Sequence, residues 1–238
     1  MTLSSKKVVV LGGGSGMGFA IARQAIEAGA TVVIVGRTEA KLASAIKALG
    51  TAASYKVFDL ADEEAVKAAF AAIGPIDHLV STAAHLTFTP VADVTTAQVH
   101  DMLGSKFWGP LYAAKYAAPQ LAKNGSITFL SGLAAYRPAP GATIVAALNA
   151  ALEGMAMGLA LELKPVRVNV VSPGVIDTPT WAFLSDEDRK GLFATVAAQL
   201  PVGRVGEADD VAEAVLAVIR NGFINATVIN VDGGGRIV

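Results

Sequence analysis

The chain has 238 residues, 53 % of them hydrophobic, and carries a formal net charge of −1 at pH 7. Its length is sufficient for one large buried core, and its scattered basic residues form none of the positive patches that nucleic-acid binding requires. The absence of cysteine excludes disulfides, thiol nucleophiles and cysteine-based metal sites. The first seven residues are polar and contain no apolar signal core, so we predict a cytoplasmic protein.

Seven short β-branched runs alternate along the chain with six stretches of helical periodicity. The runs that predict strands are Val8–Leu11, Thr31–Val35, Tyr55–Phe58, Ile76–Val80, Ile127–Leu130, Val166–Val171 and Thr227–Val231. The stretches that predict helices are Met17–Ala28, Glu39–Leu49, Glu63–Ala72, Thr96–Leu121, Ala142–Leu163 and Ala208–Arg220. Because apolar strands alternate with helices, the sequence predicts an α/β fold with a parallel sheet covered on both faces.

The longest apolar stretch and the longest connection each carry a further prediction. Ile144–Leu161 is interrupted by Asn149 and Glu153, which indicates a buried or interface helix and not a membrane span. Val175–Gly206 is longer and more polar than the other connections, which is typical of a substrate-binding or lid loop. Since no repeat or linker interrupts the chain, we predict that residues 1–238 form a single domain.

A glycine-rich turn joins the first predicted strand to the first predicted helix. Gly12, Gly16 and Gly18 have the spacing G-x-x-x-G-x-G. Glycine permits a tight turn and a close approach of the backbone to a pyrophosphate, and the N–H groups of the helix N-terminus attract the phosphates. The turn therefore predicts a Rossmann-type dinucleotide site on a doubly wound seven-stranded sheet. Its predicted cofactor-binding residues are Gly12, Gly14, Ser15, Gly16, Met17 and Gly18.

Two charged residues at the next strand ends bear on the choice of dinucleotide. Arg37 follows the second strand, where NAD-binding proteins carry an acid for the ribose 2′-hydroxyl, and no acidic residue occurs before Glu39. A guanidinium matches the charge and geometry of a 2′-phosphate, so we predict NADP(H); the alternative is an ordinary surface arginine. Asp59, after the third strand, is placed either to bind the adenine amino group or to cap the next helix.

Several stretches of the sequence resemble the short-chain dehydrogenase/reductase family. They are the glycine turn, Asp59-Leu60, Val168–Pro179, Arg204–Glu207 with Asp209–Ala212, and Val231–Gly234, which together span nearly the whole chain. The resemblance implies a nicotinamide site above the carboxyl ends of the strands, and a homo-oligomer, either a dimer or a tetramer. It also implies a cofactor-binding role for Leu60, Ala83, Pro173, Gly174, Ile176 and Thr178.

The sequence departs from this family at the positions of the catalytic side chains. The family uses a Tyr and a Lys four residues apart on the fifth helix, a Ser thirteen residues before the Tyr, and an Asn on the fourth helix. Here those positions hold, in the same order, Val145, Asn149, Gly132 and Lys106. Val145 cannot transfer a proton, and the loss of a positioned acid typically costs about 10²–10⁴ in rate. Because the cofactor motifs remain, this pattern indicates a changed or lost reaction.

Three polar residues are predicted to take part in catalysis. Lys106 is a candidate acid if burial lowers its pKa, Ser131 a candidate for orienting a carbonyl, and Asn149 a candidate for binding the nicotinamide ribose. The alternatives are an exposed lysine for Lys106 and a strand-end cap for Ser131. His85 and Tyr136 are weaker candidates for the acid. No metal-ligand spacing occurs, so no metal site is predicted.

Two hypotheses from different classes follow. The first is an NADP(H)-dependent oxidoreductase of the short-chain dehydrogenase/reductase type, which acts on a small-molecule carbonyl or alcohol with a non-standard active site. The second is a non-catalytic NADP(H)-binding sensor, or a regulatory or structural subunit. Neither hypothesis includes a nucleic-acid or a membrane partner.

Overall fold

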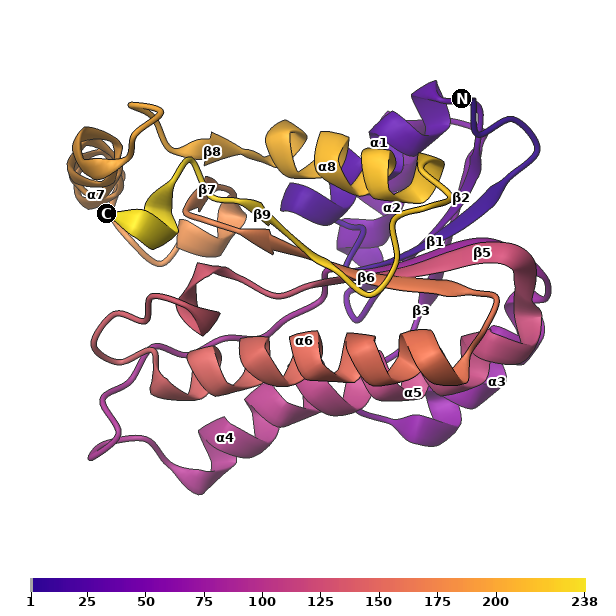
Figure 1. Cartoon of the computed structure of the whole chain (residues 1–238), viewed down its shortest axis with the longest axis horizontal. Coiled ribbons are helices and arrows are strands. Elements are labelled where there is room, and N and C mark those ends of the chain that lie inside the picture. Colours follow the sequence, from indigo (N-terminus) through magenta and orange to yellow (C-terminus); the bar gives the residue numbers. More distant parts are fainter. Residues whose placement is uncertain (1) are drawn as a thin grey trace.

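A seven-stranded parallel sheet forms the centre of the molecule (Figure 1). The computed structural model describes residues 2–238. The strand order is β3-β2-β1-β4-β5-β6-β9, and every neighbouring pair is parallel. The strands are β1 (Lys7–Leu11), β2 (Thr31–Gly36), β3 (Ala53–Val57), β4 (Ile76–Ser81), β5 (Leu121–Leu130), β6 (Arg167–Pro173) and β9 (Val228–Val231). Each overlaps one of the seven predicted strands.

Helices cover both faces of this sheet (Figure 1). One face carries α1 (Gly16–Glu27), α2 (Glu39–Leu49) and α8 (Ala208–Arg220). The other face carries α3 (Glu63–Ile73), α5 (Gly109–Ala117) and α6 (Thr143–Glu162). Along β1, Val8 and Val10 belong to the first core, whereas Val9 and Leu11 belong to the second. A strand with both faces buried must be apolar throughout, so the predicted doubly wound α/β fold is confirmed.

The order of the strands reverses between β1 and β4, and this reversal positions the functional site. From β1 the chain proceeds outward to β2 and β3, and from β4 it proceeds outward on the other side to β5 and β6. Loops that follow β1 and β4 therefore diverge and leave a crevice at the carboxyl ends of these two strands. Thr82 binds the two ends together, because its backbone N–H and its hydroxyl both donate to the Leu11 carbonyl at 2.9 Å.

The predicted helix over Thr96–Leu121 is divided into several helical pieces. It consists of α4 (Thr96–Leu103), a π-helical turn at Gly104–Trp108, α5, and a 3₁₀ turn at Ala118–Gln120. Pro110 has no N–H for the carbonyl four residues earlier, at Lys106, and this missing donor accounts for the wider turn. The prediction was also too long by one residue, because Leu121 begins β5 and pairs with Ile76.

The segment 175–206, hereafter the lid segment, contains more regular structure than a loop. Its two ends pair as the short parallel strands β7 (Ile176–Asp177) and β8 (Gly206–Glu207), and between them lies α7 (Asp186–Gln199). Ser185 caps α7 by accepting a hydrogen bond from the Asp188 backbone N–H at 3.1 Å. The helix consists of exposed and half-buried residues, so it lacks the apolar periodicity by which the other helices are predicted.

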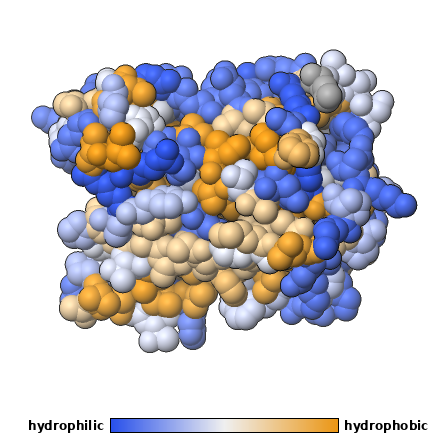
Figure 2. All heavy atoms as spheres, viewed as in Figure 1, coloured by the Kyte–Doolittle hydropathy of each residue, from blue (hydrophilic) through white to orange (hydrophobic). Residues whose placement is uncertain are grey.

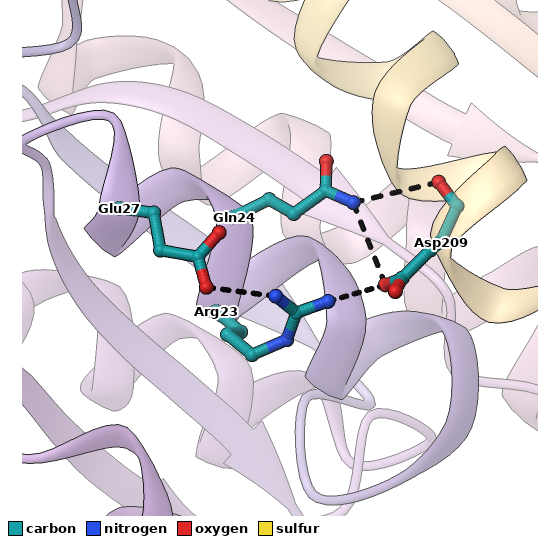
Figure 3. A network of polar contacts seen from close by, with 4 residues as sticks. All are labelled: Arg23, Gln24, Glu27 and Asp209. Atoms are coloured by element: carbon teal, nitrogen blue, oxygen red, sulfur yellow. Dashed lines mark hydrogen bonds and ion pairs between the residues drawn. The ribbon is translucent and has the colours of Figure 1, made fainter.

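A polar network on the surface joins α1 to α8 (Figure 3). The Arg23 guanidinium bonds both Glu27 on its own helix and Asp209 at the start of α8, and the Gln24 amide donates to Asp209. These side chains are substantially exposed, so their contribution to stability is small. Their geometric effect is to align the first turn of α8 with the middle of α1.

Helix α6 has a buried side and an apolar exposed side. By length and composition it could cross a membrane, but residues along one side of it pack against the sheet. Its other side exposes Met157 and Leu161, and Figure 2 shows apolar residues spread over this helix. Such a surface is typical of a contact with another protein chain.

One buried arginine provides a test of how the far end of the sheet is held. Arg167 at the start of β6 donates to the carbonyls of Val218, Ile219 and Ile224 at 2.8–2.9 Å. Arg167→Met leaves these acceptors without their donor, and we expect it to lower the free energy of unfolding by about 3 kcal/mol. Urea denaturation measures this, and exposed Arg220→Met is the matched control; equal stability of the two variants would contradict the assignment.

Candidate functional site

A hollow of about 350 Å³ lies in the crevice at the carboxyl ends of β1 and β4. Its lining includes most of the predicted cofactor residues: Gly12, Ser15, Gly16, Met17, Gly18, Arg37, Asp59, Leu60, Ala83 and Thr178. The remaining four, Gly14, Pro173, Gly174 and Ile176, do not line it, and Ile176 lines a separate hollow next to β8. The predicted catalytic residues Lys106, Ser131 and Asn149 are buried near the end of β5 and are also outside the lining.

The glycine turn forms the floor of the hollow. Gly12 has a φ of +84°, which a side chain would strain. A Cβ on Gly18 would lie 2.3 Å from the Gly12 carbonyl oxygen and 2.7 Å from Thr82 Oγ1, so no other residue fits there. The first turn of α1 is therefore held directly against the end of β1.

The N-terminus of α1 offers a site for an anion. Ser15 occupies the N-cap position with extended backbone, and the first turn of the helix contains no acidic side chain. The unbonded N–H groups and the positive end of the helix dipole favour a phosphate at this point. Thr178, from the start of the lid segment, lies over the same turn, with its Cβ 3.4 Å from where a Cβ on Gly16 would be.

Two cations line the part of the hollow beyond β2. They are Arg37, which follows β2, and Lys41 in the first turns of α2; sequence analysis did not identify Lys41. Glu39 lies between them in the sequence, but its carboxylate accepts a hydrogen bond from the Tyr55 hydroxyl at 3.2 Å and does not line the hollow. This end of the hollow therefore has the charge that suits a 2′-phosphate.

Asp59 lies beside these cations and does not cap the helix that follows it. The Asp59 carboxylate lies 3.9 Å from the Arg37 guanidinium and accepts from the Ala61 backbone N–H at 3.0 Å. The cap of α3 is Asp62, whose carboxylate accepts from the Ala65 N–H at 3.0 Å. Asp59 consequently remains on the wall of the hollow, as an adenine-binding role requires.

Lys106 is buried and donates to backbone carbonyls at the end of β5. Its Nζ lies 3.0 Å from the Ser131 carbonyl oxygen and 3.3 Å from that of Leu130. Burial lowers the pKa of Lys106 from 10.5 to about 8. The π-helical turn directs this side chain inward, so the predicted exposed-lysine alternative is wrong. Both hydrogen bonds are to main-chain carbonyl groups, which favours a role in holding the end of β5 in place over a role as the acid.

Asn149 occupies the space that Gly132 leaves free. Its Nδ2 donates to the Gly132 carbonyl at 3.3 Å, and a Cβ on Gly132 would lie only 3.0 Å from that nitrogen. Its Oδ1 is buried and has no hydrogen-bond partner among residues 2–238. A buried acceptor without a donor is energetically costly.

Val145 belongs to a small apolar cluster at the start of α6. Its buried neighbours in that cluster are Met102, Ala142 and Leu148, and half-buried apolar residues from the β4–α4 loop and the π-helical turn surround them. The Val145 side chain is therefore surrounded by hydrocarbon.

Glu153 is a buried carboxylate whose contacts with the loop after β5 could not be predicted from the sequence. It accepts hydrogen bonds from Ser131 Oγ at 2.9 Å and from the Tyr136 hydroxyl at 2.6 Å. Ser131 thus directs its hydroxyl toward α6. Burial and the bond to Glu153 raise the pKa of Tyr136 to about 12, so this phenol holds its proton near neutral pH. The signal in the sequence is a charged residue within the most apolar helix.

Comparisons with known proteins agree with this geometry. A family model described as enoyl-(acyl carrier protein) reductase matches residues 12–235. The short-chain dehydrogenase/reductase malC of Malbranchea aurantiaca is 33 % identical over 98 % of this chain and 95 % of its own. The chain belongs to the short-chain dehydrogenase/reductase family. The predicted family membership is thereby confirmed.

Solved structures of similar proteins show the same fold. The MalC reductase/Diels-Alderase of Malbranchea aurantiaca has a TM-score of 0.93 at 31 % identity, over 99 % of this chain and 98 % of that one. A small-chain dehydrogenase in complex with NADPH has a TM-score of 0.83 at 35 % identity, over 98 % of this chain and 99 % of that one. This short-chain dehydrogenase/reductase therefore shares the fold around the glycine turn with a relative whose structure was solved in complex with NADPH.

The contact between Gly18 and Gly12 can be tested in this short-chain dehydrogenase/reductase. Gly18→Ala forces α1 away from β1 because the added methyl group overlaps the Gly12 carbonyl. We expect dinucleotide affinity to fall at least about tenfold, which corresponds to about 1.4 kcal/mol. Isothermal calorimetry measures this, and Gly191→Ala, where an added Cβ meets nothing within 4 Å, is the control. Equal dinucleotide affinity of the two variants would contradict the role of the contact between Gly18 and Gly12 in dinucleotide binding.

Burial of Lys106 gives a pH-dependent stability with a defined sign. The folded chain releases this proton above about pH 8, whereas the unfolded chain keeps it to about 10.5, so folding is penalised below pH 8. The penalty is relieved as the pH rises from 8 toward 10.5. We therefore expect the wild type to gain stability relative to Lys106→Met over that interval, measured by urea denaturation at several pH values. A constant difference would contradict it; exposed Lys123→Met is the control.

Proposed function

We propose that this protein is an NADP(H)-dependent oxidoreductase that transfers hydride between the nicotinamide cofactor and a small-molecule carbonyl or alcohol. The observation that carries the proposal is the hollow itself, in which a glycine cradle, an open helix N-terminus and two cations follow one another along the path of a dinucleotide. A chain that no longer bound the cofactor would have no need for glycine at positions 12 and 18 of this turn.

The residues present fit NADP(H). The first turn of α1 would hold the diphosphate, Arg37 and Lys41 the 2′-phosphate, and Asp59 the adenine. Asn149 would hold a hydroxyl of the nicotinamide ribose on its unpartnered Oδ1. When bound, the cofactor supplies the hydride. The similar small-chain dehydrogenase in complex with NADPH supports this choice.

The proposed reaction proceeds without the usual Ser, Tyr and Lys. Lys106 and Asn149 have in effect exchanged places, so that the amine enters from the π-helical turn and the amide from α6. In this arrangement Lys106 fixes the end of β5 and retains a positive charge near the site, and Asn149 takes over ribose binding. Ser131 acts through its backbone carbonyl and, by its bond to Glu153, holds the loop before α6 in place.

The surroundings of the site complete the proposal. The chain would act as one domain, with the lid segment 175–206 over a small-molecule substrate. The apolar side of α6, with Met157 and Leu161 exposed, would join it to a second copy in a homo-oligomer.

A second candidate function is a non-catalytic NADP(H)-binding sensor. It rests on Val145, because an apolar cluster at the position of the family's acid cannot donate a proton. This candidate keeps the same cofactor and the same hollow, so only turnover separates the two.

Two measurements test the proposal in sequence. Calorimetric titration with NADPH and, separately, with NADH establishes the cofactor, and we expect tight binding of NADPH and weak binding of NADH. NADPH oxidation is then followed with a panel of aldehydes and ketones that differ in size and polarity. Turnover of any member supports the oxidoreductase, and tight NADPH binding without turnover across the panel favours the sensor.

The cationic end of the hollow predicts how the preference for NADPH is lost. Arg37→Ala removes a charge-assisted bond to the 2′-phosphate, so NADPH affinity should fall by about tenfold to a hundredfold while NADH affinity stays the same. Lys47→Ala, on the outer part of α2 and away from the hollow, is the matched control. Parallel losses for NADPH and NADH would show that Arg37 does not read the 2′-phosphate.

A further inference from the structure

We propose that His85 donates the proton in this reaction. The inference rests on the proposed oxidoreductase function and identifies the acid that the function requires. His85 follows β4 directly after the loop residues Ala83 and Ala84, and all three line the hollow. Its side chain is exposed. After the imidazolium has donated its proton, the neutral imidazole can therefore take up another from solvent.

The backbone of His85 is held firmly for a residue in a loop. Its N–H donates to Ser105 Oγ at 2.9 Å, and the same hydroxyl lies 3.4 Å from the His85 carbonyl oxygen. Ser105 belongs to the π-helical turn and also lines the hollow. The turn therefore serves two purposes, since it directs Lys106 inward and anchors the loop that carries the imidazole. A general acid must be positioned in this way to be effective.

The other groups near the end of β5 are not arranged as acids. Lys106 donates to two backbone carbonyls and does not line the hollow, and Tyr136 is bonded to Glu153. The charged side chains that line the hollow with His85 are Arg37, Lys41 and Asp59. These three follow β2 and β3, on the far side of β1, while Ser105, which contacts the His85 backbone, is uncharged. Among these side chains, only imidazole ordinarily changes its charge between pH 5 and 8.

In the reducing direction, the bound cofactor would supply the hydride that forms a C–H bond at the carbonyl carbon, while the C=O π electrons move to oxygen. The N–H bond of the His85 imidazolium breaks as an O–H bond forms. The products are the alcohol, the oxidised cofactor and neutral imidazole, which is reprotonated from water. Alcohol oxidation is the reverse, with neutral His85 as the base.

The chain has three histidines in three different environments, which makes a direct test practical. His78 is buried and bonded to Ser126 Oγ at 2.9 Å, and burial lowers the pKa of His78 to about 4. His100 is exposed on α4, away from the hollow. His85 alone combines exposure with a place in the hollow.

The first experiment locates His85 without measuring activity. Diethyl pyrocarbonate modifies accessible imidazoles, and mass spectrometry reads the modified positions. We expect His85 and His100 to react in the free protein, and saturating NADPH to protect His85 while leaving His100 reactive. Equal modification of His85 with and without bound NADPH would overturn the inference.

The second experiment measures the chemical role. With a carbonyl substrate found in the panel and NADPH at saturation, His85→Gln should lower kcat by about 10²-fold or more while the circular dichroism spectrum stays the same. Added imidazole should restore part of the rate that this variant loses. His100→Gln is the matched control and should behave as the wild type.

The two proposals fail in different ways. A wild type that oxidises no NADPH with any carbonyl overturns the oxidoreductase function and the role of His85 with it. An active wild type whose His85→Gln variant keeps the same kcat overturns the role of His85 alone.

Discussion

The close approach of Gly18 to the Gly12 carbonyl is the constraint on which the rest of the site depends. Because no side chain separates α1 from the end of β1, the first turn of the helix begins directly over the crevice. The same contact brings Thr82 of the neighbouring strand against both glycines and places Thr178 of the lid segment over Gly16. One steric condition thus sets the positions of two strand ends, one helix terminus and the start of the lid segment.

A second constraint concerns the backbone carbonyl groups at the end of β5, which need hydrogen-bond donors. The carbonyls of Leu130, Ser131 and Gly132 all receive hydrogen bonds from side chains, and these side chains are Lys106 and Asn149. Buried carbonyls need donors, but any element that packs nearby can supply them. Two helical segments therefore share the task, because an amine reaches these carbonyls from the π-helical turn and an amide reaches them from α6. Gly132 and Asn149 are coupled further, since the amide fills the volume that a larger residue at 132 would need.

Much of the fold could be predicted from the sequence because its signals are local. The periodicities of α2 and α8 gave their bounds without error, and the glycine spacing located the crevice. The place of Arg37 on the wall of the hollow could be predicted because this residue directly follows a strand. The place of Lys41 and the hydrogen bond between Glu39 and Tyr55 could not be predicted. This bond depends on β3 lying beside β2.

The parts that were missed depend on tertiary contacts. The helix α7 has no apolar stripe, so only its cap and acidic first turn indicate it. The partners of Glu153 lie in a loop 17 and 22 residues earlier, and no periodicity predicts such contacts. Lys106 was identified as a candidate buried residue, but the π-helical turn that directs it inward was not predicted.

The pairing of β7 with β8 has a consequence for how the protein tolerates change in this segment. The two short strands join the ends of the lid segment to each other, with Ile176 paired to Gly206. The residues between them can change in length or composition without displacing the ends, as in other loops closed at their base. Insertions and deletions between the two strands are therefore expected to leave the glycine turn and the start of α8 in place.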